Sequence, residues 1–90
     1  VEGIGGSEPP ANLHREVIDA VERISDAESF AMVKRLVREE GLLVGGSAGT
    51  NAAAALRLAE RGKVEGPIVT IMPDSWDRYQ AKPWMQGWRP

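Results

Sequence analysis

The residues with the clearest chemical potential are a serine and the small residues around it, in Gly45-Gly-Ser-Ala-Gly49. A short apolar run precedes this stretch and an alanine-rich segment follows it, which is the order of a tight turn leading into a helix. The first turn of a helix has backbone N–H groups without partners and carries a partial positive charge. We therefore predict that the Ser47 hydroxyl and the neighbouring N–H groups bind an acceptor atom or an anion of a small molecule.

Two other interpretations of this turn have to be weighed. The first is a plain strand-to-helix turn in which Ser47 is only the N-cap of the helix. The second is a phosphate-binding loop, which the stretch matches poorly because it has neither the lysine of a P-loop nor the full dinucleotide-binding spacing.

Two helices are predicted on either side of the turn. Ser25 and Glu28 have the spacing of a capping box, and the helix that they begin ends at Gly41. Its apolar face is predicted from residues at helical spacing, namely Phe30, Val33, Leu36 and Val37. The second helix is predicted from Ser47 or Ala48 to about Arg61, with Gly62 as its C-terminal cap.

Three short apolar segments are predicted as strands: residues 17–24, 42–44 and 67–72. The order strand, helix, strand, helix, strand is typical of an α/β fold with parallel strands and right-handed crossovers. We therefore expect residues 1–90 to form a single segment, a partial three-layer αβα arrangement with a short parallel sheet. Two helices do not cover both faces of such a sheet, so this fold is expected to be incomplete.

Composition excludes several classes of function. The 90 residues suffice for one small domain, and 11 basic against 13 acidic residues argue against binding to nucleic acid. The chain contains no cysteine, which excludes disulfides and thiolate metal ligands and fits a cytoplasmic location; no metal site is expected. No apolar run approaches the ~18 residues of a membrane span, and the layout of a signal peptide is missing.

Several other residues favour structural interpretations. His14 lies alone in a predicted loop and is interpreted as a solvated residue. Asp74 follows a predicted strand and is read as part of an Asx-type turn in preference to a titrating group. The tryptophans Trp84 and Trp88 are interpreted as packing or interface anchors. A charged run is expected to be the solvated face of the first helix: Lys34, Arg35, Arg38, Glu39 and Glu40.

Five motifs, taken in order, resemble one known family. They are VEGIG at 1–5, SDAESFAM at 25–32, REEGLLVGGSAG at 38–49, IVTIMPDS at 68–75 and the pattern of Arg78, Tyr79 and Lys82. This order is similar to the C-terminal part of the cystathionine β-synthase and cysteine synthase family, which are pyridoxal-phosphate enzymes of fold type II, the tryptophan-synthase-β-like class. The residues of the first and third motifs favour cystathionine β-synthase over cysteine synthase. The resemblance implies the C-terminal portion of a catalytic domain, with no regulatory domain expected.

The resemblance implies a cofactor site around pyridoxal 5'-phosphate. Ser47 matches the family position whose hydroxyl bonds the pyridine nitrogen of the cofactor. A neutral hydroxyl at the positive end of a helix disfavours a protonated ring, in agreement with the prediction from the turn itself. The remaining implied cofactor-binding residues lie in the same turn or in two flanking loops: Gly46, Gly3, Ile4, Gly5, Pro73 and Asp74.

No catalytic residue of the family has a counterpart in this chain. The family's Schiff-base lysine and its phosphate-binding loop lie earlier in the fold, and none of Lys34, Lys63 and Lys82 matches the catalytic position. Without that lysine the isolated chain is expected to be inactive.

Three functions follow as expectations. The first is a piece of a lyase that joins serine to homocysteine to form cystathionine, and the second is a cysteine synthase that uses O-acetylserine and sulfide. The third is a non-catalytic module that binds a small ligand or a partner through the Ser47 turn. For the full-length enzyme we expect amino-acid and thiol substrates and a homodimer, with no nucleic-acid or membrane partner.

Overall fold

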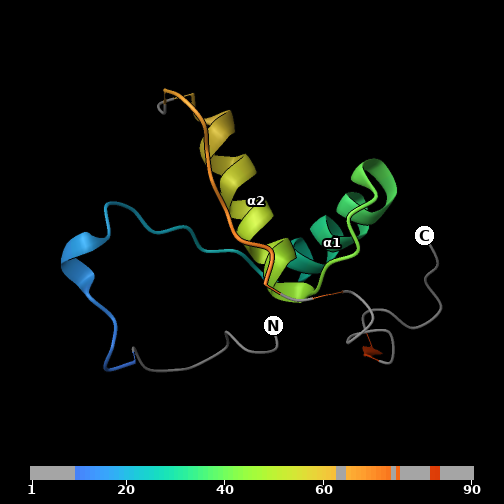
Figure 1. The fold of residues 1–90 in the computed structure, drawn as a ribbon, viewed down its shortest axis with the longest axis horizontal. Coiled ribbons are helices and arrows are strands. Elements are labelled where there is room, and N and C mark those ends of the chain that lie inside the picture. Colours follow the sequence, from blue (N-terminus) through green and yellow to red (C-terminus); the bar gives the residue numbers. More distant parts are fainter. Residues whose placement is uncertain (1–9, 63–64, 74, 76–81, 84–90) are drawn as a thin grey trace.

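The computed structural model describes residues 10–62, 65–73, 75 and 82–83. Its helices are the 3-10 helix η1 (Arg15–Val17) and two α-helices, α1 (Asp26–Glu40) and α2 (Gly46–Glu60). Both α-helices begin near the same point and diverge toward their C-terminal ends like the arms of a V (Figure 1). The glycine turn that precedes α2 therefore lies where the two helices meet.

Helix α1 begins and ends where its sequence signals predict. Ser25 Oγ accepts from the N–H of Glu28 at 3.1 Å, and Glu28 Oε2 accepts from the N–H of Ser25 at 2.8 Å, which is a complete capping box. At the other end Gly41 is left-handed, with φ of +69°, and its N–H bonds the carbonyls of Leu36 and Val37. The prediction for this helix is confirmed.

Helix α2 begins one residue earlier than its sequence suggests. Gly45 is the N-cap, in an extended conformation, and Gly46 is the first helical residue. Ser47 is therefore inside the first turn, so the alternative in which it serves only as the N-cap is wrong. The helix ends at Glu60, and Gly62 just beyond it has φ of +68°, as its predicted role in helix termination requires.

The core of the described residues is small and lies where the two helices meet. Val33, Val37, Val44 and Ala48 are its buried apolar members, and Leu36 packs against them. The most buried stripe of α1 runs through Ser29, Val33 and Val37, at spacing of four residues. Phe30 and Leu36 of the predicted apolar face are only half-buried.

Helices α1 and α2 approach each other closely because Gly49 has no side chain. A Cβ at this position would overlap the carbonyl oxygen of Ser29 and lie 2.6 Å from Cγ2 of Val33. Ser29 and Val33 are both fully buried. Backbone therefore packs against backbone at the vertex of the V, and only glycine permits that separation.

The predicted parallel sheet is not found among the residues that the structure describes. Val17 closes η1, residues 18–25 have no regular secondary structure, and residues 67–73 form no ladder. One isolated antiparallel bridge joins Val44 to Ser75. Strand hydrogen bonds need a neighbouring strand in register, and among the described residues the two outer apolar segments pair with none: Val21 is 82% exposed and Val69 is 89% exposed. The sheet remains a prediction.

The extended segments nevertheless run beside α2. Residues 65–73 follow the length of the helix in Figure 1 and lead back toward its first turn. Residues 20–24 reach the same helix, and a groove of about 380 Å³ over α2 is lined by both segments together with Thr50, Asn51 and Leu58. Helix α2 is thus the element against which both predicted outer strands are arranged.

An ion-pair cluster joins the start of α1 to the C-terminal end of α2. Arg57 Nη2 donates to Glu28 Oε1 at 2.6 Å, and Arg57 Nη1 donates to the carbonyl of Arg23 at 2.9 Å. One turn later, Arg61 Nη2 donates to Glu22 Oε2 at 3.1 Å. The hydrogen bond from the Ser25 N–H lowers the pKa of the Glu28 carboxyl below its ordinary 4.5, desolvation opposes this, and the Arg57 charge lowers the pKa further.

Two expectations concern other parts of the chain. His14 is in fact a solvated residue, 71% exposed, with Nδ1 3.3 Å from Oε1 of Glu16. Trp84 and Trp88 lie outside the described residues. No helix in the described part of the chain is long and apolar enough to cross a membrane.

Replacing Gly49 with alanine tests the close approach of the helices. Overlap with Ser29 and Val33 is expected to lower the free energy of unfolding by about 1–3 kcal/mol. At a helix position with free space, replacing glycine with alanine would instead raise it. The measurement is urea denaturation followed by circular dichroism. Ala59→Ser, which adds one atom at an exposed site of the same helix, is the control and is expected to stay within about 0.5 kcal/mol. Unchanged or raised stability of G49A would contradict the packing described.

The lowered pKa of Glu28 predicts a pH-dependent contribution to stability. Because the folded-state pKa lies below the ordinary value, the ionised carboxylate stabilises the folded state fully above pH 4.5, and this contribution is lost as pH falls through the folded pKa. Glu28→Gln preserves a capping side chain but removes the charge beside Arg57. We expect E28Q to be less stable than the wild type at neutral pH and the difference to shrink in acid. Thermal melts from pH 7 to pH 3 measure this, and a constant difference would refute it.

Candidate functional site

The candidate site is the turn from Val44 to Gly49, which is the most buried stretch of the chain that the structure describes. Val44 is 7% exposed, Ser47 is 7% exposed and Ala48 is fully buried. Gly45, Gly46 and Gly49 are buried as well. These residues are small, so the backbone of the turn lies close to the surface of the site while its side chains occupy little space.

The first turn of α2 presents a set of backbone donors. The N–H of Gly49 bonds the carbonyl of Gly45 at 3.3 Å, so the N–H groups of the three residues before it have no partner inside the helix. The first turn contains no acidic side chain that would offset its partial positive charge. This arrangement suits an electron-rich atom of a ligand.

The Ser47 side chain is buried in that turn and available for a ligand. Gly45, the N-cap, has no side chain to cap the helix, and Ser47 is the second helical residue. Within the part of the chain that the structure describes, its hydroxyl makes no hydrogen bond. The residue is only 7% exposed, so few water molecules can reach this hydroxyl, and a ligand atom at the start of α2 would complete its bonding.

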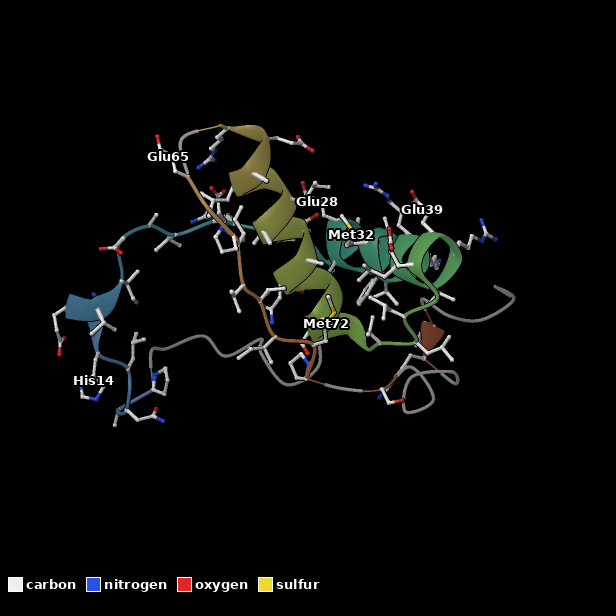
Figure 2. The ribbon with its side chains drawn as sticks, turned by 45° about the horizontal axis from the view of Figure 1, so that its top comes forward. His14, Glu28, Met32, Glu39, Glu65 and Met72 are labelled. Carbon is white, nitrogen blue, oxygen red and sulfur yellow. The ribbon has the colours of Figure 1, made fainter. Side chains whose placement is uncertain are left out.

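A second segment of the predicted site is held beside this turn by two contacts. The Val44–Ser75 bridge joins the residue just before the turn to the loop that follows residues 67–73. Asn51 Nδ2 donates to the carbonyl of Ile71 at 2.8 Å, from the second turn of α2. Figure 2 shows Met72 beside the first turns of α2 and His14 far from them. The exposed residue Pro73 lies between these two contacts.

The predicted site residues therefore fall into two groups. Gly46, Ser47 and Pro73 are described, and the structure brings the ends of their two segments together. Gly3, Ile4, Gly5 and Asp74 lie outside the described residues.

Three polar residues that support the turn were missed by the sequence reasoning: Ser29, Thr50 and Asn51. The Ser29 hydroxyl lies 2.6 Å from that of Thr50, and Thr50 Oγ1 donates to the carbonyl of Gly46 at 3.3 Å. A signal for Ser29 existed, because it precedes Val33 and Val37 by four and eight residues and so lies on the buried stripe of α1. A polar residue on such a stripe indicates a polar partner across the interface.

The comparison with protein families identifies one match over most of the chain. The family profile of pyridoxal-phosphate dependent enzymes matches residues 1–74. That range contains the whole turn, both α-helices and the segment that returns along α2.

Individual relatives carry two kinds of enzyme name. A cysteine synthase of Helicobacter pylori is 42% identical over 82 residues, covering 91% of this chain and 27% of the relative. A cystathionine beta-synthase of Oryctolagus cuniculus is also 42% identical over 82 residues, covering 91% of this chain and 15% of the relative. An O-acetylserine dependent cystathionine beta-synthase of Bacillus subtilis is 37% identical over 86 residues, covering 96% and 28%. The chain thus spans less than a third of the length of these relatives.

Replacing Asn51 with alanine tests how the returning segment is held. Loss of the hydrogen bond to Ile71 is expected to lower the free energy of unfolding by about 0.5–1.5 kcal/mol and to shift the ¹³C carbonyl resonance of Ile71. Asn12→Ala, in an exposed turn, is the control and is expected to change neither quantity. An unchanged Ile71 resonance in N51A would show that the contact does not hold this segment in solution.

Proposed function

The chain belongs to the family of pyridoxal-phosphate dependent enzymes, and we propose that it supplies the part of a β-replacement active site that holds the pyridine ring of the cofactor. The observation that carries this proposal is the Ser47 hydroxyl in the first turn of α2, which belongs to a residue only 7% exposed and makes no hydrogen bond with the described part of the chain. Its surroundings fit a flat aromatic ring, because Gly45, Gly46 and Ala48 leave the turn without bulky side chains.

In this proposal the Ser47 hydroxyl donates a hydrogen bond to the ring nitrogen. A hydroxyl has one proton to give and no charge, so it pairs with an unprotonated nitrogen without requiring a pyridinium. The partial positive charge of the α2 N-terminus acts in the same direction, because it raises the free energy of a cation placed there. Ser47 would thereby select the neutral ring.

The neutral ring determines which chemistry the cofactor supplies. Pyridoxal 5'-phosphate withdraws electrons from the α-carbon of a bound amino acid, and an unprotonated ring does so less strongly than a pyridinium. That difference favours loss and replacement of a group on the β-carbon. The role of this chain is to hold and orient the ring and to keep its nitrogen free of a proton.

Two loops complete the proposed ring site. Gly3, Ile4 and Gly5 would border the cofactor and the substrate, and Pro73 and Asp74 would border the pyridine end. The Val44–Ser75 bridge and the Asn51–Ile71 hydrogen bond support the second assignment, because they hold the flanks of that loop next to the Ser47 turn. Gly46 would contribute its backbone N–H and a surface without a side chain.

The proposed reaction joins serine and homocysteine to form cystathionine. The alternative is cysteine synthesis from O-acetylserine and sulfide, and the 42% identity to the cysteine synthase of Helicobacter pylori supports it. The identity to the cystathionine beta-synthase of Oryctolagus cuniculus is the same, so identity does not separate the two reactions. The motifs at residues 1–5 and 38–49 favour the first reaction. Assaying the full-length protein with both substrate pairs separates the two, since one yields cystathionine and the other cysteine.

The remaining parts of the proposal concern these 90 residues as part of a larger enzyme. The lysine that holds the cofactor is proposed to lie outside these 90 residues, so that the chain by itself is inactive. The whole enzyme is proposed to be a cytoplasmic homodimer. A non-catalytic binding module is the competing function, and cofactor-dependent turnover by the full-length protein would exclude it.

Replacing Ser47 with alanine tests the proposed ring contact. In the full-length protein loaded with cofactor, we expect a shifted absorption band of the cofactor and turnover slowed about tenfold, the effect of losing roughly 1.4 kcal/mol of interaction. Thr70→Ala removes a hydroxyl from the exposed extended segment and is the matched control. A cofactor spectrum and turnover in S47A equal to those of the wild type would rule out this role for Ser47.

A further inference from the structure

The buried hydroxyl pair between α1 and α2 is a polar feature that the proposed ring site does not itself use. Ser29 has no exposed surface, and its Oγ is 2.6 Å from Oγ1 of Thr50. Ser29 Oγ is also within hydrogen-bonding distance of the carbonyl oxygen of Ser25, at 3.0 Å, and Thr50 Oγ1 of the carbonyl oxygen of Gly46, at 3.3 Å. These contacts form one continuous series of hydrogen-bonding groups from Ser25, the N-cap of α1, to Gly46, the first residue of α2.

Counting hydroxyl protons shows that Ser29 and Thr50 do not simply bond their own helices independently of each other. The two hydroxyls have two protons for three hydrogen bonds, so only two bonds carry a proton at a time. In isolated helices each hydroxyl is satisfied by the carbonyl four residues earlier. Here the short bond between Ser29 and Thr50 means that one hydroxyl is turned toward the other helix. The two helices therefore share a single hydrogen-bond system.

This system ends on the peptide group that orients Ser47. The carbonyl of Gly46 and the N–H of Ser47 belong to one planar peptide unit, so a bond to the oxygen restrains the direction of the N–H. The Ser47 Cα belongs to the same peptide unit, so the orientation of this unit also determines the direction of the Ser47 side chain. Gly49 lets the turn pack directly on Ser29 and Val33 of α1. The turn that carries Ser47 is thus bonded at its first peptide and lies against α1 three residues later.

We infer that Ser29 and Thr50 are positioning residues for Ser47: their buried hydroxyl pair fixes the first turn of α2 so that the Ser47 hydroxyl meets the ring nitrogen of pyridoxal 5'-phosphate. The inference rests on the proposed function. It assigns a role to two residues that touch neither the cofactor nor the substrate. A hydrogen bond to a ring nitrogen is strongly directional, so a small rotation of the Gly46–Ser47 peptide weakens it.

The test compares three variants of the full-length holoprotein. Thr50→Val keeps the side-chain shape and removes the hydroxyl, Ser29→Ala removes the other hydroxyl, and Thr50→Ser retains a hydroxyl. We expect T50V and S29A each to weaken cofactor affinity about fivefold, the equivalent of one neutral hydrogen bond. Both are also expected to shift the cofactor absorption band in the direction that S47A shifts it. T50S is expected to match the wild type. Titration of the apoprotein with pyridoxal 5'-phosphate gives the affinity.

A double-mutant cycle with Ser47→Ala distinguishes positioning from general loss of stability. If Thr50 acts through Ser47, T50V weakens cofactor binding in the wild type but has no further effect in the S47A protein. If Thr50 only supports the fold, its effect on affinity is the same in both backgrounds, and the inference is overturned. Should T50V fail to fold, the same cycle is run with S29A, which removes one buried oxygen and leaves the backbone of α2 unchanged.

The outcomes separate failure of this inference from failure of the proposed function. If S47A binds the cofactor with the affinity and absorption band of the wild type, the proposed ring contact is wrong and the inference falls with it. If S47A alters both while T50V and S29A alter neither, the ring contact stands and only the positioning role is overturned. Loss of affinity in T50V and S29A that disappears in the S47A background supports both.

Discussion

The contact on which the rest of the structure depends is the backbone-to-backbone approach of α2 to α1 at Gly49. A side chain there would displace the helix from Ser29 and Val33, the two residues of largest fully buried volume. The small core, the buried turn and the hydroxyl pair between the helices all lie within a few residues of this contact. The described residues bury few apolar side chains, so their packing depends strongly on each close contact.

Local features of this protein were predictable from sequence because their causes are local. The capping box of α1 involves residues three apart, and the left-handed conformation of Gly41 follows from its lack of a side chain. The same holds for Gly62 after α2 and for the glycine turn before it. The place of Ser47 at the start of the helix was also predictable, since a serine among glycines before an alanine-rich segment is a recognisable pattern.

Features that depend on distant partners were not predictable in the same way. The pairing of Ser29 with Thr50 depends on how the two helices cross, and the bond from Asn51 to Ile71 depends on where an extended segment returns. The sheet shows the same limit. Apolar runs such as residues 67–72 indicate burial, yet Val69 and Ile71 are 89% and 71% exposed in this chain. An apolar strand pattern indicates a surface that has to be buried, and the helices or strands that bury it are not part of the pattern itself.

The distribution of charge among the described residues agrees with the neutral contact proposed at Ser47. The acidic residue Glu28, adjacent to Ser29 in sequence, is occupied by the Ser25 N–H and by Arg57. Arg57 itself lies ten residues beyond Ser47, about 15 Å along the helix axis. Among the described residues, the hydrogen bond and the close contact given for the first turn of α2 involve hydroxyls, carbonyls and small apolar groups. The helix dipole at this turn favours an electron-rich atom over a cation.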